Sequence, residues 1–125
     1  MTSPQATGAE AERPRPEQVA LAWLALVDAG DARASWRRAA TFFRSMVKET
    51  QWAQSVQRVR QSLGRVVARR LTSATPATEL PGAPDGQYLV LQFETEFEHK
   101  QSAVETVTPM LDVDGVWRVS GYFVR

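Results

Sequence analysis

The final third of the chain alternates between apolar and polar residues with the two-residue period of a half-buried β-strand. The alternation is clearest over 88–97, continues over 103–112, and resumes over 116–124 after Asp114 and Gly115. An Asp-Gly pair between two apolar runs is a strong hairpin signal, because its tight turn needs positive φ angles. The chain is therefore predicted to end in an antiparallel meander.

Upstream of these strands, apolar residues recur at the three-to-four-residue spacing of amphipathic helices. Pro16 is well placed to open the first helix, and Gly30 ends it. A second helical stretch covers 36–47, and a third begins near Thr50 and stops at Gly64. The N-terminal half is thus predicted to contain three helices.

Residues 65–73 have the β-branched content of another strand, and the proline-rich stretch over 75–84 reads as the longest loop. Three helices followed by four strands indicate an α+β fold, in which the helices cover one face of a four-stranded antiparallel sheet. We expect a flexible tail over 1–15 and a single domain over 16–125, long enough to bury its own core.

The composition excludes several kinds of site. The 125 residues contain no cysteine and one histidine, His99, which excludes disulfides, thiolate metal sites and multi-histidine metal centres. We expect neither a metal nor a cofactor. No segment is apolar for long enough to span a membrane, and no signal peptide is recognisable before Pro16.

Charge is unevenly distributed along the chain. Residues 33–70 hold ten Lys or Arg and one acid, whereas residues 79–125 hold eight acids and three bases. The split is compatible with a basic surface for nucleic acid or anionic lipid. We favour two halves that largely cancel, because the net charge is +1 and no nucleic-acid motif is present.

The turns predict which side chains share a face of the sheet. A two-residue loop at Asp114 and Gly115 pairs Thr106 with Phe123, and the preceding hairpin then aligns Phe93 with Thr106. In this register the face beneath the helices contains Leu89, Leu91, Phe93, Phe97, Val104, Met110, Trp117, Val119 and Phe123.

The opposite, outer face mixes aromatic, apolar and acidic residues. Glu94 is predicted to lie directly opposite Glu105, which is destabilising unless a cation such as Arg69 lies beside them. We favour an interface, either between two copies or with another protein, over a catalytic carboxylate pair, because no cleft is implied there. The interface candidates are Tyr88, Val90, Glu94, Glu105, Val107, Tyr122 and Val124.

Tryptophans along the helices suggest a ligand pocket as an alternative. Trp23, Trp36 and Trp52 are candidates to line a cavity between helices and sheet, with Arg60 as an anion clamp. The same spacing is more typical of a hydrophobic core, which we favour. No ionisable residue of the last three strands falls on the predicted core face, so we assign no catalytic residue. Candidates for a general acid or base are then confined to Asp28, Arg60 and Arg70.

An ordered series of short motifs extends along most of the chain. It contains Trp23-Leu24, Ser35-Trp36, Trp52, Arg60, Leu63-Gly64, Arg70, Pro84-Asp85-Gly86-Gln87-Tyr88, Phe97, Glu105-Thr106, Asp114-Gly115-Val116-Trp117 and Gly121-Tyr122. Over residues 17–125 this series resembles the bacterial domain of unknown function 4019. The resemblance implies a cystatin-like or nuclear-transport-factor-2-like cone of helices on a curved sheet. It also implies a bacterial and often exported protein, and it implies no activity or catalytic residue.

Two functions follow as expectations. The preferred one is a non-enzymatic binding or protein-interaction module that forms a homodimer through its outer sheet face. The alternative is an isomerase- or dehydratase-like cone that holds a small hydrophobic ligand between helices and sheet. The resemblance favours a periplasmic or secreted location if a leader was removed, and a cytoplasmic one otherwise.

Overall fold

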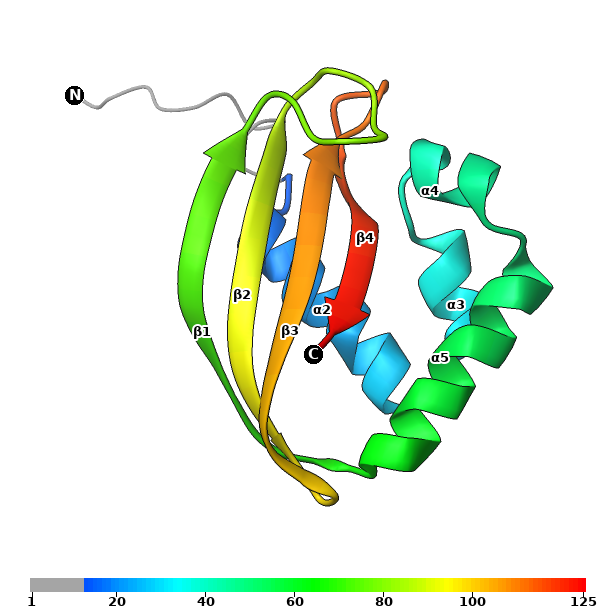
Figure 1. Ribbon diagram of the computed structural model, residues 1–125. Coiled ribbons are helices and arrows are strands. Elements are labelled where there is room, and N and C mark those ends of the chain that lie inside the picture. Colours follow the sequence, from blue (N-terminus) through cyan, green and yellow to red (C-terminus); the bar gives the residue numbers. More distant parts are fainter. Residues whose placement is uncertain (1–12) are drawn as a thin grey trace.

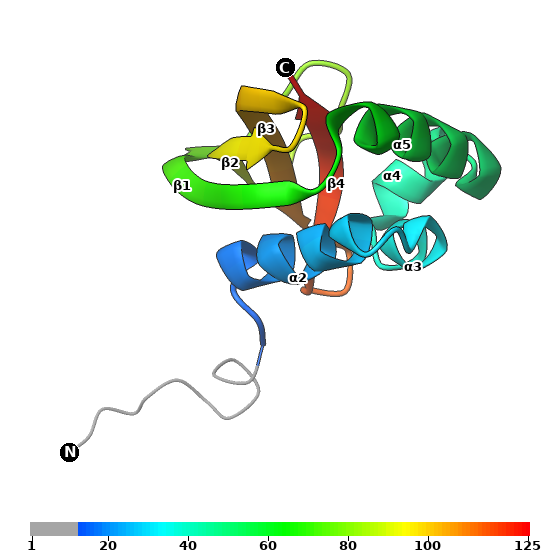
Figure 2. The same cartoon turned by 90° about the horizontal axis from the view of Figure 1, so that it is seen from below.

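The computed structural model describes residues 13–125, in which helices precede strands as expected (Figure 1). The helices are α2 (Pro16–Asp28), α3 (Ala32–Arg37), α4 (Thr41–Met46) and α5 (Glu49–Leu63). The strands are β1 (Val66–Ala77), β2 (Tyr88–Phe97), β3 (Lys100–Leu111) and β4 (Trp117–Val124). The sheet is antiparallel in the order β1-β2-β3-β4. Figure 2 shows α2 against one face of the curved sheet and α3 to α5 beyond β4, which confirms the α+β fold.

Four helical segments replace the predicted three, because the stretch over 36–47 is interrupted at Ala40. Its backbone is extended, with φ −61° and ψ 152°, and its N–H donates to the carbonyl of Val119 at 2.7 Å. The N–H of Thr41 then donates to the Asp112 carboxylate at 3.0 Å, so a residue beyond β3 caps the new helix. The interruption depends on long-range contacts and leaves no local sequence signal.

The β3–β4 hairpin has a three-residue loop instead of the predicted two-residue one. Asp112 N–H donates to the Val116 carbonyl at 2.9 Å, and Gly115, at φ +80°, donates to the Asp112 carbonyl at 2.9 Å. This is a type I turn followed by a left-handed glycine. The extra loop residue shifts the pairing, so Met110 lies opposite Arg118.

A bulge in β4 compensates for that shift further along the strand. Between the pairs Pro109–Val119 and Val107–Tyr122, β4 has one more residue than β3. Both Val119 and Tyr122 therefore face the helices. Phe123 lies opposite Thr106, as predicted, but the pair is on the outer face, and Phe123 is 56% exposed there.

The faces of β3 are also reversed relative to the prediction. A two-residue turn pairs Phe97 with Lys100, and a bulge follows in β3, so Phe93 lies opposite Glu105 and not Thr106. Glu105 is consequently beneath the helices, fully buried. This corrects the prediction that it lies opposite Glu94 on the outer face.

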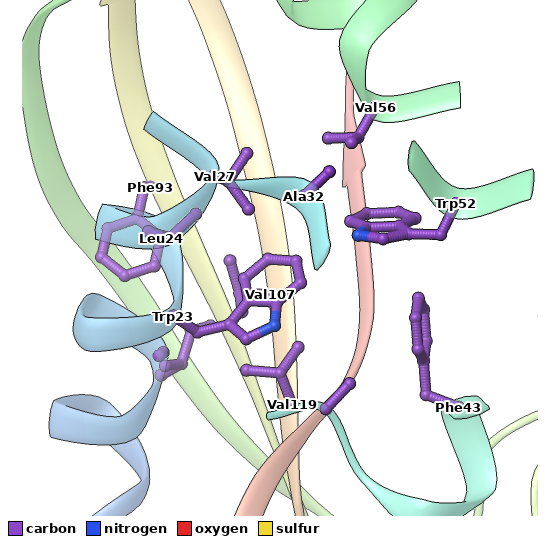
Figure 3. Packing of buried hydrophobic residues seen from close by; sticks show 13 residues of the cluster. Trp23, Leu24, Val27, Ala32, Phe43, Trp52, Val56, Phe93, Val107 and Val119 are labelled. Atoms are coloured by element: carbon purple, nitrogen blue, oxygen red, sulfur yellow. The ribbon is translucent and has the colours of Figure 1, made fainter. Parts of the chain in front are cut away.

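The predicted core face of β2 is confirmed, since Leu91, Phe93 and Phe97 are buried. Figure 3 shows the main cluster, in which side chains from α2 and α5 meet those of the strands. Its buried members are Ala20, Trp23, Leu24, Val27, Ala32, Ala39, Phe43, Trp52, Val56, Leu91, Phe93, Val107 and Val119. Val104 and Phe123, both predicted for this face, lie instead on the outer face, opposite Glu94 and Thr106.

Candidate functional site

The three candidate pocket tryptophans pack within the protein. Trp23 and Trp52 are 2% and 8% exposed, with ring centroids 5.8 Å apart, and Trp36 is partly buried against the same core cluster. The indole N–H of Trp23 donates to the Ser35 carbonyl at 2.8 Å, and that of Trp52 donates to the Ser35 hydroxyl at 2.9 Å. The indole N–H of Trp36 donates to the Val47 carbonyl at 2.7 Å. These donors serve the fold itself, as expected of core residues.

A group of polar side chains, here called the ionic cluster, lies between the helices and the sheet beside the aromatic residues. At its centre, Glu105 Oε1 accepts from Arg69 Nε at 2.7 Å and from the Thr95 hydroxyl at 2.6 Å. Glu105 Oε2 accepts from Arg69 Nη2 at 3.2 Å and from the Tyr122 hydroxyl at 2.5 Å. Two bonds at each oxygen use the whole acceptor capacity of the carboxylate. The members of the ionic cluster are Asp28, Arg60, Arg69, Thr95, Glu105 and Tyr122.

Arg69 joins Glu105 to a second carboxylate on α2. Its Nη1 and Nη2 donate to Asp28 at 2.8 and 3.0 Å, and Arg60 Nη2 donates to Asp28 at 2.6 Å. Burial opposes ionisation of Asp28, but the arginine hydrogen bonds outweigh it, so the pKa of Asp28 lies below its usual value. Burial and the neighbouring Glu105 carboxylate raise the pKa of the Tyr122 hydroxyl. At neutral pH the Asp28 carboxylate is therefore ionised, and the Tyr122 hydroxyl stays protonated and donates its hydrogen bond.

Arg60, the predicted anion clamp, is an internal residue. Beyond its ion pair with Asp28, its guanidinium lies 5.1 Å from the centre of the Phe97 ring. Its Nε and Nη1 atoms are buried and have no hydrogen-bond partner among the described residues. Its stem and head therefore support the edge of the core.

The structure separates the two glutamates that the sequence placed together. Glu105 is bound by Arg69 on the helix side, and Glu94 forms an ion pair with Arg70 on the outer side. Arg69 was therefore a correct partner for Glu105, although on the other face of the sheet. Arg70, a candidate acid–base residue, is exposed in this surface ion pair.

Most of the predicted interface residues are not on the outer face. Tyr88 is 2% exposed beneath the 78–87 loop, with its hydroxyl on the Pro84 carbonyl at 2.5 Å. Only Val90 and Glu94 of the predicted set remain on the outer face without such cover. Self-association through that face stays a prediction. The residues that lie on the helix side are Glu105, Val107, Tyr122 and Val124.

The two edges of the sheet differ in how well they are protected. β1 carries register shifts after Val66 and Leu71, includes Pro76, and bears Arg69 and Arg70, all features that discourage pairing with another strand. The end of β4 lacks them until the terminal arginine. The edge of β4 is therefore the more open one.

Backbone alternation shows which β4 groups point outward. Val104 and Arg125 form a hydrogen-bonded pair, in which each N–H donates to the carbonyl of the other residue, at 2.9 and 3.0 Å. Bonded and non-bonded pairs alternate along an antiparallel ladder, so Tyr122 and Val124 form non-bonded pairs with β3. Tyr122 and Val124 thus direct N–H and C=O away from β3, and no backbone group of residues 13–125 bonds to them there. At the other half of β4, the outward carbonyl of Val119 already accepts from the N–H of Ala40, the residue before α4.

A groove of about 220 Å³ lies beside this open edge, between β4 and α5. It is mainly apolar, and Val59 and Phe123 on its sides are 43% and 56% exposed. It unites one residue from the predicted pocket with two from the predicted interface. The residues that line it, here called the β4–α5 groove, are Trp52, Ser55, Val56, Val59, Tyr122, Phe123 and Val124.

Comparison with protein families identifies the family to which the chain belongs. A family model described as a protein of unknown function (DUF4019) matches residues 19–122. The chain belongs to this family. The match extends from within α2 to within β4, so the DUF4019 domain includes every residue of the ionic cluster and all but the last two of the β4–α5 groove. No curated protein and no solved structure gives a significant match.

Two further structural findings concern metal sites and membrane-spanning helices. Within residues 13–125, no three histidine, aspartate or glutamate side chains gather as a metal site requires. In the same part of the chain, no helix has the length and apolar character needed to cross a membrane.

Proposed function

We propose that this DUF4019 domain is a non-enzymatic protein-interaction module that binds an extended segment of a partner chain along the edge of β4. The observation that carries the proposal is the open edge at Tyr122 and Val124, which lies beside an apolar groove. An added strand would gain main-chain hydrogen bonds from the edge, and side-chain contacts would select its sequence.

The groove favours a peptide over a small molecule. Its volume of about 220 Å³ falls below the range of roughly 300–1,000 Å³ that is usual for small-molecule pockets. Every second side chain of an added strand would point to the helix side, where Val59 and Trp52 lie. We therefore expect the bound segment to place an apolar residue there and to alternate apolar with polar residues.

A single extended segment is a better occupant of this edge than a second copy. Figure 2 shows α5 beside β4, so two domains paired through β4 would each bring an α5 helix to the same edge. One strand needs only the spacing of about 4.8 Å between neighbours in a sheet. The proposed partner contact therefore differs from the face-to-face homodimer that the sequence predicts.

The ionic cluster supports a non-enzymatic role. A general acid or base must reach the substrate within hydrogen-bond distance. Glu105 is fully buried and both of its oxygens are saturated by protein donors. Its carboxylate therefore serves the fold, and binding is assigned to the surface groove.

The test is selection of short random peptides displayed on phage against the wild-type domain. We expect enriched sequences with alternating apolar residues, and slower amide exchange at Tyr122 and Val124 when such a peptide is added. Val59→Arg should abolish the enrichment because it fills the groove with a charge. Leu71→Arg is the matched control, since Leu71 is also 43% exposed but lies on the opposite edge.

A second variant addresses the backbone contribution. Val124→Pro removes an outward N–H without removing a bond to β3, and should weaken peptide binding while leaving the unfolding transition in place. The proposal fails if selection yields no enriched peptide. It also fails if the enriched peptides bind Val59→Arg and Leu71→Arg equally well.

A further inference from the structure

A second groove lies at the opposite end of β4, between α2, the end of α3 and the β3–β4 loop. Its volume is about 340 Å³, within the usual range for small-molecule sites. The inner surface is largely apolar, and the rim carries arginines. The principal lining residues are Val19, Trp23, Val116 and Trp117 on the inner surface and Arg37, Arg38 and Arg118 on the rim.

The rim has more positive charge than its neighbours neutralise. Arg118 is paired with two aspartates. Arg37 is 65% exposed, and its nearest carboxylate, Glu49, lies 3.9 Å away without a hydrogen bond. Arg38 is exposed and has neither an ion pair nor a side-chain hydrogen bond within residues 13–125. No carboxylate of residues 13–125 lines the groove, so an anion would find an available guanidinium beside an apolar surface.

The fourth tryptophan, Trp117, lines the groove and differs from the other three in its hydrogen bonding. The indole N–H groups of the other three tryptophans each have an acceptor in the protein. Trp117 is the exception among the described residues, because its partly buried ring has no acceptor there. Tryptophan N–H groups usually find a partner when their rings are buried. The Trp117 N–H is not among the buried unpaired atoms, so it is accessible to water or to a ligand oxygen.

We propose that this groove binds a small, free amphipathic carboxylate. The apolar part packs against Val19 and Trp117, and the carboxylate is held by the forked guanidinium of Arg38. A neutral hydrophobic ligand would leave the arginines unused, and a compact dianion would leave the apolar surface uncovered. The site is separate from the β4–α5 groove and shares no lining residue with it.

The test uses 3-phenylpropionate as the probe and 3-phenylpropionamide as its neutral counterpart. Binding is followed by NMR titration of the ¹⁵N-labelled domain, with the indole N–H of Trp117 as the reporter. We expect the acid to bind saturably and to shift that signal. The amide should bind at least about tenfold more weakly, because a hydrogen bond to a charged group is lost.

Matched arginine variants locate the contact. Arg38→Gln should weaken acid binding by at least about tenfold and leave amide binding unchanged. Arg33→Gln in α3, the helix that Arg38 follows, is the control, since Arg33 is 76% exposed and lies outside the groove. Val59→Arg, which blocks the β4–α5 groove, should leave acid binding unaffected, so failure of one proposal does not entail failure of the other.

The inference is overturned by any of three results. One is the absence of saturable binding of the acid to the wild-type domain. Another is equal binding of acid and amide, which would show that the arginines do not select charge. The third is an equal loss of affinity in Arg38→Gln and Arg33→Gln, which would reduce the effect to net charge.

Discussion

The interface between helices and sheet has an apolar half and an ionic half, and the two meet at Tyr122. The Tyr122 ring lies 5.4 Å from that of Trp23, whereas its hydroxyl binds Glu105 at 2.5 Å. The apolar half is held by close packing and requires only the right volume and shape. The ionic half requires particular atoms at particular positions.

The ionic half links every strand of the sheet. Arg69, Thr95, Glu105 and Tyr122 come from β1, β2, β3 and β4 in turn, and Asp28 adds α2. A shift of one residue in any strand would turn its member of the cluster to the other face. We infer that the apolar half supplies most of the stability, whereas the ionic half selects one register.

The largest expected effect comes from the apolar half. Trp23→Ala should lower the free energy of unfolding by about 3–5 kcal/mol, because it opens a cavity in a packed core. Leu21→Ala on the same helix should cost less than about 1 kcal/mol, since Leu21 is 51% exposed. Urea unfolding measures both. Equal losses would contradict the assignment of stability to the buried aromatic contacts.

A smaller effect is expected when one charge of the ionic half is removed without changing its shape. Glu105→Gln should cost about 2 kcal/mol, because the amide group meets donors from Arg69 and Tyr122. Glu94→Gln is the matched control: it loses only a surface ion pair whose Glu94 side chain is 57% exposed, and should cost less than about 1 kcal/mol. If the two variants unfold at the same urea concentration, Glu105 does not have the central role that its four hydrogen bonds suggest.

The contrast between Glu94 and Glu105 also shows which features of the fold can be predicted from the sequence. Alternation predicts β2 and its buried face, because Leu91 and Phe93 must avoid water whatever the register. The placement of Glu105 depends on a turn one residue longer and on bulges in β3 and β4. Gly121 lies within the β4 bulge and is the sequence signal for that bulge, since a glycine inside a strand often marks such a site.

The candidate sites were less predictable than the fold, because they form where separate elements meet. Trp52 is assigned to a pocket and Tyr122 to an interface when each strand or helix is considered alone. The structure places both beside one groove, because α5 lies next to the edge of β4. The break at Ala40, which depends on Asp112 far along the chain, is unpredictable for the same reason.

The smallest expected effect concerns the charge of Asp28 in the ionic half and depends on pH. The pKa of folded Asp28 is lowered, since arginine hydrogen bonds overcome the opposing effect of burial. The unfolded value is about 3.9, so the stabilisation is complete above about pH 5 and is lost as the pH falls through the folded pKa. Asp28→Asn should therefore lower the free energy of unfolding at about pH 7 more than at about pH 3. Urea unfolding at both pH values measures the difference, and a penalty that does not change with pH would show that the Asp28 charge contributes nothing to the ionic half.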